Sequence, residues 1–195
     1  AKAMRDGHTG YTHSMGILPL REALAAYYER EYGAKVSPDR IVVTSGTSAA
    51  MLLLFMAMFD KGGSLLMADP SYACYANFAL YTGADILALR TREEHGFQLE
   101  MDDVRAALNP AVKAILVNSP SNPGGTIVSP EEYKALCGMG PMILADEIYH
   151  GMVSGGRANS VLEYSDQACA LDGFSKRYAM TGWRLGWMVI PEDLV

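Results

Sequence analysis

The sequence predicts one three-layer α/β/α domain whose sheet is mostly parallel, and three observations support this fold class. Short apolar runs alternate with helix-like segments along the chain. Residues 114–117 are apolar without interruption, which is typical of a parallel strand buried on both faces. Half of the 195 residues are hydrophobic, so the chain can bury a substantial core, and its length favours a single domain.

The strands are predicted where short apolar or β-branched runs lie between turn residues. These runs are residues 40–44, 64–68, 83–89, 114–117, 141–145, 168–171 and 187–190. In an open α/β sheet, ligands collect beyond the carboxyl ends of the strands. The residues that follow the strands are therefore the first candidates for a functional site.

The helices are predicted from their periodicity and their end signals. After Pro19 an amphipathic pattern predicts a helix that ends near Gly33. Residues 49–59 are apolar on every face, so we expect this helix to be buried on all sides. Ser129 and Glu132 predict a capping box at the start of a helix. The remaining expectations are a loop at 7–16, helices at 72–81, 102–108 and 130–137, and a small helix near Val161.

Charge and hydropathy argue against two classes of partner. The formal net charge of −6 offers no basic surface for nucleic acid. The longest apolar run, residues 49–59, is shorter than the ~20 residues that a membrane-spanning helix needs. The residues after Lys2 and Arg5 are polar, unlike the apolar stretch of a signal peptide. We therefore expect no nucleic-acid partner and no membrane segment.

Cysteine usage favours a reducing compartment. The three cysteines, Cys74, Cys137 and Cys169, are odd in number and lack metal-ligand spacing, and the histidines do not cluster with them in the sequence. We expect a cytoplasmic protein without a metal site. No glycine-rich dinucleotide or nucleoside-triphosphate motif follows a predicted strand.

Residues 172–187, which read DGFSKRYAMTGWRLGW, place Lys176 in a turn between two predicted strands. We expect this lysine to be held among apolar neighbours. Such a lysine loses solvation of its ammonium group, which frees the neutral amine to attack a carbonyl. A lone lysine that caps a strand at the surface is the alternative.

Two further positions suggest charge recognition. Gly46, Thr47 and Ser48 lie between a strand and a helix, where free backbone amides and hydroxyl groups can hold an anion, although Ser or Thr at a helix start can also be an ordinary N-cap. Asp146 directly follows a predicted buried strand, and a carboxylate there needs a cation. A structural salt bridge would also satisfy Asp146.

Three motifs, in this order, resemble those of class I and II aminotransferases, the pyridoxal-phosphate enzymes of fold type I. They are residues 118–125 (NSPSNPGG), residues 146–149 (DEIY), and Ser175-Lys176 followed by residues 180–186 (MTGWRLG). The resemblance covers nearly the whole chain. It implies a seven-stranded sheet with one antiparallel strand, bound pyridoxal 5'-phosphate, and a homodimer with active sites at the interface.

The resemblance also implies roles for the catalytic candidates. Lys176 would form a Schiff base with pyridoxal phosphate and move the α-proton of the substrate. Asp146 would pair with the protonated pyridine nitrogen. Asn122 and Tyr149 would bind the phenolic oxygen of the ring.

The remaining candidates would bind the phosphate and the ring. By the same resemblance, Arg184 and Ser175 join Gly46, Thr47 and Ser48 around the phosphate, where the guanidinium of Arg184 can bind in bidentate fashion. Tyr72 would stack on the pyridine ring. The alternative is a core tyrosine, and the nearby Tyr75 is a rival for either role. Tyr11 would reach the phosphate in the active site of the neighbouring subunit, and a solvent-facing loop tyrosine is the alternative.

The implied function is transfer of an amino group between an L-amino acid and a 2-oxo acid. Members of the family are longer, so residues 1–195 are expected to form the cofactor-binding large domain without its N-terminal arm and C-terminal small domain. A carbon–sulfur lyase or a decarboxylase would use the same residues. A non-catalytic module that binds pyridoxal phosphate is a further alternative.

Overall fold

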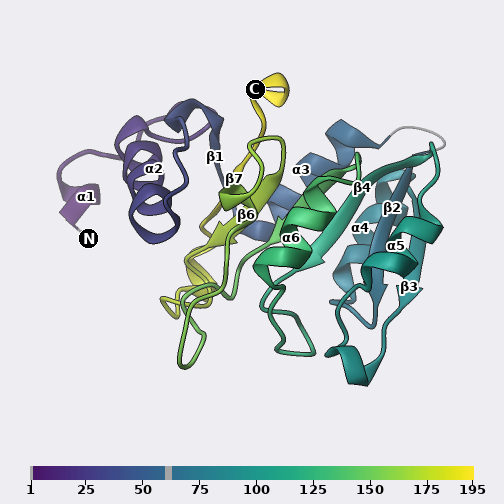
Figure 1. Ribbon diagram of the computed structural model, residues 1–195. Coiled ribbons are helices and arrows are strands. Elements are labelled where there is room, and N and C mark those ends of the chain that lie inside the picture. Colours follow the sequence, from purple (N-terminus) through teal and green to yellow (C-terminus); the bar gives the residue numbers. More distant parts are fainter. Residues whose placement is uncertain (1, 60–62) are drawn as a thin grey trace.

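The computed structural model describes residues 2–59 and 63–195, and within these residues a seven-stranded sheet forms the centre of the molecule (Figure 1). Its strand order is β1-β7-β6-β5-β4-β2-β3. The strands are β1 (Ile41–Thr44), β2 (Ser64–Asp69), β3 (Asp85–Arg90), β4 (Val112–Asn118), β5 (Met142–Asp146), β6 (Cys169–Gly173) and β7 (Gly186–Val189). Strand β7 runs antiparallel to both of its neighbours, β1 and β6, and the other pairs are parallel. The predicted fold class is therefore confirmed.

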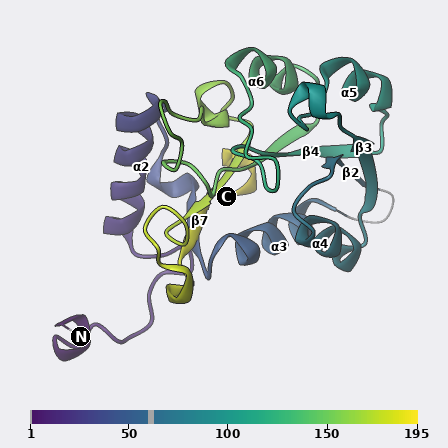
Figure 2. The same cartoon turned by 90° about the horizontal axis from the view of Figure 1, so that it is seen from below.

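Helices cover both faces of this sheet, as seen end-on in Figure 2. Helices α3 (Thr47–Met58) and α4 (Cys74–Thr82) pack on one face, where they form a core cluster with residues of β2, β4, β6 and β7. Helices α2 (Leu18–Tyr32), α5 (Met101–Ala107) and α6 (Pro130–Cys137) pack on the other face around a second cluster. Because the sheet is covered on both faces, its strands and the helices that pack on it all contribute apolar residues to a core, which explains the alternation of apolar strands and helices in the sequence.

The predicted strands all form, with ends that differ from the prediction by two residues or fewer. Strand β3 begins two residues later than predicted, because Gly83 caps the preceding helix in a left-handed conformation with φ of 80°. The signals for the helix ends also hold. Gly33 caps α2 in the left-handed conformation, and Ser129 and Glu132 form the predicted capping box of α6. The small helix near Val161 is a 3₁₀ turn, Val161–Glu163.

The prediction that the apolar helix α3 is buried on all sides is wrong. Leu53 is 50% exposed and Met56 is 61% exposed, whereas Leu54 and Phe55 lie in the core. One face of α3 packs on the sheet, and the opposite face is exposed. The apolar sequence of the helix alone did not distinguish the two faces.

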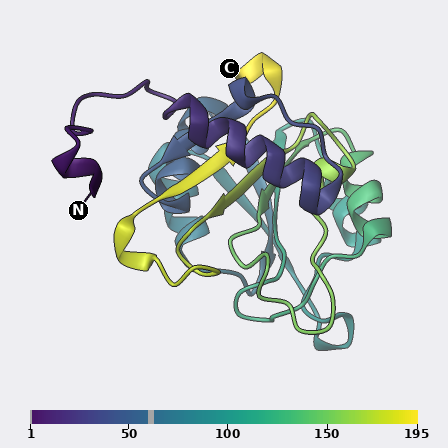
Figure 3. The same cartoon turned by 90° about the vertical axis from the view of Figure 1, so that its left-hand side faces the viewer.

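The N-terminal segment projects away from the body of the domain (Figure 3). It contains the short helix α1 (Lys2–Arg5), which the sequence did not predict, and then the predicted loop. Tyr11 in this loop is fully exposed.

The other 3₁₀ turns are Pro38–Arg40, Glu93–His95, Thr181–Trp183 and Glu192–Leu194. No helix in the described parts of the chain has the length and apolarity to cross a membrane.

Candidate active site

A cavity of about 320 Å³ opens at the carboxyl ends of β4, β5 and β6, beside the start of α3. This is the edge of an α/β sheet where ligands collect. Most of the residues singled out in the sequence meet here. The lining consists of Thr47, Ser48, Tyr72, Tyr75, Asn118, Asn122, Asp146, Ile148, Tyr149, Ser175, Lys176, Thr181 and Arg184.

Asp146 lies at the inner end of the cavity and is only 5% exposed. Its Oδ2 accepts a hydrogen bond of 2.7 Å from the hydroxyl of Tyr75, and its Oδ1 accepts one of 3.2 Å from the N–H of Ile148. Burial raises the pKa of Asp146, while Tyr75, the Ile148 N–H and Lys176 lower it. The carboxyl group is thus oriented by two donors but has no salt-bridge partner within 4 Å among the described residues, so the alternative of a structural salt bridge is not observed.

Of the two roles left open for Tyr75, the structure supports that of a core tyrosine, because its side chain is buried in the cluster under α3 and α4. Its hydroxyl group donates to Asp146, 71 residues away, which the sequence did not predict. Tyr72 lines the cavity, is 38% exposed, and packs edge-to-face on Tyr75 with ring centroids 5.3 Å apart. No local sequence signal indicates a hydrogen bond across this distance, since it depends on how α4 packs beside β5.

Asn122 and Tyr149 lie together on one wall. The Nδ2 of Asn122 is 3.3 Å from the hydroxyl oxygen of Tyr149, to which it donates. The backbone N–H of Asn122 donates to the Oδ1 of Asn118 at 2.7 Å, and the Nδ2 of Asn118 donates to the backbone carbonyl of Asp146 at 2.9 Å. Asn118 therefore ties the loop after β4 to the end of β5 and fixes both site segments.

Lys176 lies in the turn after β6, as predicted, and its Nζ is 5.7 Å from the centre of the Tyr149 ring. The prediction that apolar neighbours hold it is wrong, because Lys176 is exposed to the cavity. The apolar residue of the turn, Phe174, instead packs against Trp187 with ring centroids 5.0 Å apart, on the side of α2.

The opposite end of the cavity is suited to an anion. Helix α3 begins at Thr47, and no side chain caps its N-terminus, so its first backbone N–H groups are free of side-chain partners. The interpretation of Thr47 or Ser48 as an ordinary N-cap is therefore wrong. The hydroxyl groups of Thr47, Ser48 and Ser175 line the same cavity.

Arg184 adds a positive charge at the same end of the cavity. Its Nη1 donates to the carbonyl of Thr181 at 3.0 Å, and its Nη2 donates to the carbonyl of Ser45 at 3.4 Å. Gly46 does not line the cavity, but a Cβ built on it would collide with the guanidinium group of Arg184. Gly46 also has φ of 89°, which disfavours other residues. The glycine thus lets Arg184 lie against the start of α3.

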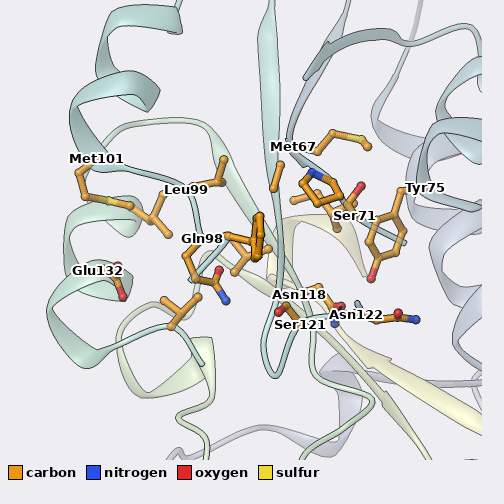
Figure 4. Close-up of a pocket in the computed structure, with 17 residues that line it drawn as sticks. Met67, Ser71, Tyr75, Gln98, Leu99, Met101, Asn118, Ser121, Asn122 and Glu132 are labelled. Atoms are coloured by element: carbon orange, nitrogen blue, oxygen red, sulfur yellow. Dashed lines mark hydrogen bonds between the residues drawn. The ribbon is translucent and has the colours of Figure 1, made fainter. Parts of the chain in front are cut away.

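A second, narrower cavity lies beside the site and is shown in Figure 4. Its volume is about 30 Å³, which is room for roughly two water molecules. Tyr75, Asn118 and Asn122 line both cavities, and apolar residues such as Leu99 and Met101 line the rest of the narrow one. Of these two adjoining cavities, the one of about 320 Å³ has room for a ligand of cofactor size.

The larger cavity fits pyridoxal phosphate by the chemistry of its groups. An anion end, an amine and a buried carboxylate lie around a single space, which matches the phosphate, the aldehyde and the pyridinium nitrogen of this molecule. Two observations favour such a ligand: no side chain caps the N-terminus of α3, and the buried carboxylate of Asp146 forms no salt bridge within the described residues. Across residues 2–59 and 63–195, no group of three potential metal ligands gathers.

Comparison with known proteins gives consistent results. The family model "Aminotransferase class I and II" matches residues 2–195. Valine–pyruvate aminotransferase of Mycobacterium tuberculosis is 38% identical over 100% of this chain and 51% of its own length, and aspartate aminotransferase of Geobacillus stearothermophilus is 33% identical over 100% and 52%. The chain thus spans about half the length of the curated relatives it matches.

Solved structures agree with the sequence comparison. Aspartate aminotransferase from Thermus thermophilus with maleate superposes with a TM-score of 0.95 at 33% identity, covering 99% of this chain and 52% of that one. An aminotransferase from Mycobacterium tuberculosis gives a TM-score of 0.92 at 37% identity, covering 99% and 51%. With a family match over almost its full length, the chain belongs to the aminotransferase class I and II family.

Proposed function

We propose that this chain is the cofactor-binding large domain of a pyridoxal-phosphate-dependent aminotransferase, which moves an amino group between an L-amino acid and a 2-oxo acid. The observation that carries the proposal is the cavity that Asp146, Lys176 and Arg184 line together. A carboxylate, an amine and a guanidinium group around one cavity form the set that this chemistry requires.

In this proposal each end of the cavity binds one part of pyridoxal phosphate. The N–H groups at the start of α3, the hydroxyls of Thr47, Ser48 and Ser175, and the guanidinium of Arg184 hold the phosphate. Tyr72 lies against the ring, and Asn122 and Tyr149 donate hydrogen bonds to its phenolic oxygen. Asp146 pairs with the ring nitrogen.

The chemistry follows from where these groups hold protons. Pyridoxal phosphate, when bound, supplies an electron-withdrawing ring that stabilises negative charge at the α-carbon of the substrate. Lys176 Nζ takes the α-proton as a general base and returns it as a general acid. Asp146, oriented by Tyr75 and the Ile148 N–H, keeps the proton on the ring nitrogen.

The assembly and location of the protein are part of the same proposal. We propose a cytoplasmic homodimer in which Tyr11 reaches the neighbouring active site. The exposure of Tyr11 on the projecting N-terminal segment supports this, and the three free cysteines fit a reducing compartment. The names of the relatives support an amino acid and a 2-oxo acid as substrates.

The proposal is tested by a half-reaction. The purified chain is loaded with pyridoxal phosphate and mixed with a high concentration of each of several L-amino acids, and the bound cofactor is then identified by mass. We expect conversion of the aldehyde to the amine form, with release of a 2-oxo acid, and no conversion in Lys176→Ala. Release of carbon dioxide would contradict transamination and indicate a decarboxylase. Release of a thiol or sulfide with ammonia, while the bound cofactor stays in its aldehyde form, would likewise contradict it and indicate a lyase. Binding without any conversion would indicate a non-catalytic module.

A further inference from the structure

We propose that Arg177 is a positioning residue that fastens the Lys176 turn to the segment carrying Tyr149. The effect of Arg177 on the reaction of Lys176 rests on the proposed function. The contacts of Arg177 with the two segments are independent of that function. Arg177 lies outside the cavity lining found among the described residues, so it does not touch the reacting groups. It follows Lys176 directly in the chain, and its side chain crosses to two other elements.

The first contact is with Gly151, two residues after Tyr149. A Cβ built on Gly151 would lie 2.5 Å from Cδ, 2.6 Å from Nε and 2.8 Å from Cζ of Arg177. The arginine side chain therefore lies against the backbone of Gly151, in space that any other residue type would occupy. Gly151 also has φ of 78°, a conformation that glycine adopts without strain.

The second contact is with aromatic rings. The guanidinium carbon of Arg177 is 5.9 Å from the ring centre of Tyr27 on α2 and 5.5 Å from that of Tyr178. Its Nη1 also donates to the hydroxyl of Tyr27 at 3.4 Å. Cation–π contacts of this kind are individually weak at exposed sites. Together with the Gly151 contact they hold one planar group in one place, which the flexible ammonium of a lysine would not match.

The contacts of Arg177 connect the Lys176 turn to the Tyr149 segment, and each of these is closed by few backbone hydrogen bonds of its own. The Lys176 turn is closed by Ala179 N–H to the Lys176 carbonyl at 3.1 Å and by Met180 N–H to the Phe174 carbonyl at 3.3 Å. The Tyr149 segment is closed by Met152 N–H to the Tyr149 carbonyl at 3.2 Å. Because Lys176 Nζ and the Tyr149 ring face each other across the cavity, a shift of either turn changes their separation.

The test compares three substitutions with a matched control. Arg177→Met keeps an unbranched apolar stem and removes the guanidinium, and Arg177→Lys is the conservative variant. Gly151→Ala displaces the arginine from the other side. Arg30→Met is the control, because Arg30 lies 5.8 Å from the same Tyr27 ring and pairs with Glu31. Thermal unfolding of each variant confirms that the fold remains.

The first readout uses the chain without any cofactor. Hydrogen exchange is measured at the Ala179 and Met180 amides of one turn and at the Met152 amide of the other. Arg177→Met and Gly151→Ala are expected to speed exchange on the order of tenfold in both turns, Arg177→Lys to give an intermediate effect, and Arg30→Met to leave both unchanged. Exchange that rises only at Ala179 and Met180, or equally in Arg30→Met, overturns the proposal.

The second readout separates positioning from binding. In a Lys176→Ala background, Arg177→Met is expected to leave the non-covalent affinity for pyridoxal phosphate unchanged. With Lys176 present, the same substitution is expected to slow formation of the borohydride-trapped adduct on the order of tenfold. An unchanged trapping rate overturns the proposal. If the unsubstituted chain traps no cofactor, the proposed function fails, and the exchange experiment still decides the role of Arg177.

Discussion

Single residues set the charge arrangement of the site. Asp146 is buried and forms no salt bridge within the described residues, and Arg184 lies at the start of α3, so opposite charges face one cavity from its two ends. Such an arrangement costs stability in the empty protein and is offset when a ligand of matching charge binds. The residue that controls the acidic end is Tyr75, whose hydroxyl is bonded to Asp146.

Replacing Tyr75 by Phe tests this control. Without the Tyr75 hydroxyl the pKa of Asp146 is expected to rise further, because that hydrogen bond lowers it. Less of the carboxyl group is then ionised to pair with the ring nitrogen. We expect pyridoxal phosphate to bind roughly tenfold more weakly, or about 1.4 kcal/mol, by spectroscopic titration. Tyr81→Phe, on the exposed side of α4, is the control, and equal affinities for the two variants would contradict the role of Tyr75.

At the level of elements, the turn after β5 is held in place by a buried acid. Glu147 is completely buried and accepts hydrogen bonds from the Ser160 hydroxyl at 2.9 and 3.0 Å and from the Val161 N–H at 2.8 Å. Burial raises its pKa well above the ordinary value, which favours the protonated form. Through these bonds the 3₁₀ turn at Val161 supports the segment that carries Asp146 and Tyr149.

Two substitutions of Glu147 test whether its hydrogen bonds stabilise the fold. Glu147→Gln keeps an oxygen acceptor and the same size, and we expect it to change the free energy of unfolding by less than about 1 kcal/mol. Glu147→Ala leaves the Ser160 hydroxyl and the Val161 N–H buried without their acceptor, and we expect a loss of about 2–3 kcal/mol. Urea unfolding of both variants measures this difference, and equal losses would argue against the hydrogen-bonding role.

The elements were largely predictable from the sequence, because local signals specify them. Glycines at helix ends, the Ser129 capping box and apolar runs each mark a boundary within a few residues of where it forms. The errors concern what surrounds an element. The exposed face of α3, the exposure of Lys176 and the Tyr75–Asp146 bond all depend on residues distant in sequence, which no local pattern encodes.

At the level of the whole molecule, stability depends on buried titratable groups behind the site. His150 is 1% exposed, lies 2.9 Å from the Tyr32 hydroxyl and 3.6 Å from Glu147, and burial lowers its pKa from 6.5 to about 4. The unfolded chain therefore binds a proton at His150 between pH 6.5 and 4 that the folded chain does not. Stability attributable to His150 is present above pH 6.5 and is lost as the pH falls through this window.

Replacement of His150 by Gln is expected to remove this loss. Between pH 6.5 and 4 the unsubstituted chain should lose roughly 3 kcal/mol more of unfolding free energy than His150→Gln. Glu147 acts in the opposite sense, since its raised pKa makes stability fall as the pH rises, but it is present in both proteins. Urea unfolding across the pH range measures the difference. Parallel pH profiles would show that His150 is not the titrating group.

The account depends most directly on Lys176 as the amine that meets the cofactor. The measurement is borohydride reduction of the chain with pyridoxal phosphate, followed by mass mapping of the modified peptides. We expect a reduced adduct on Lys176, and none at this site in Lys176→Ala, because Lys176 is the one lysine among the described residues that line the cavity. An adduct spread over exposed lysines such as Lys35 and Lys113, or no adduct at all, would contradict the account.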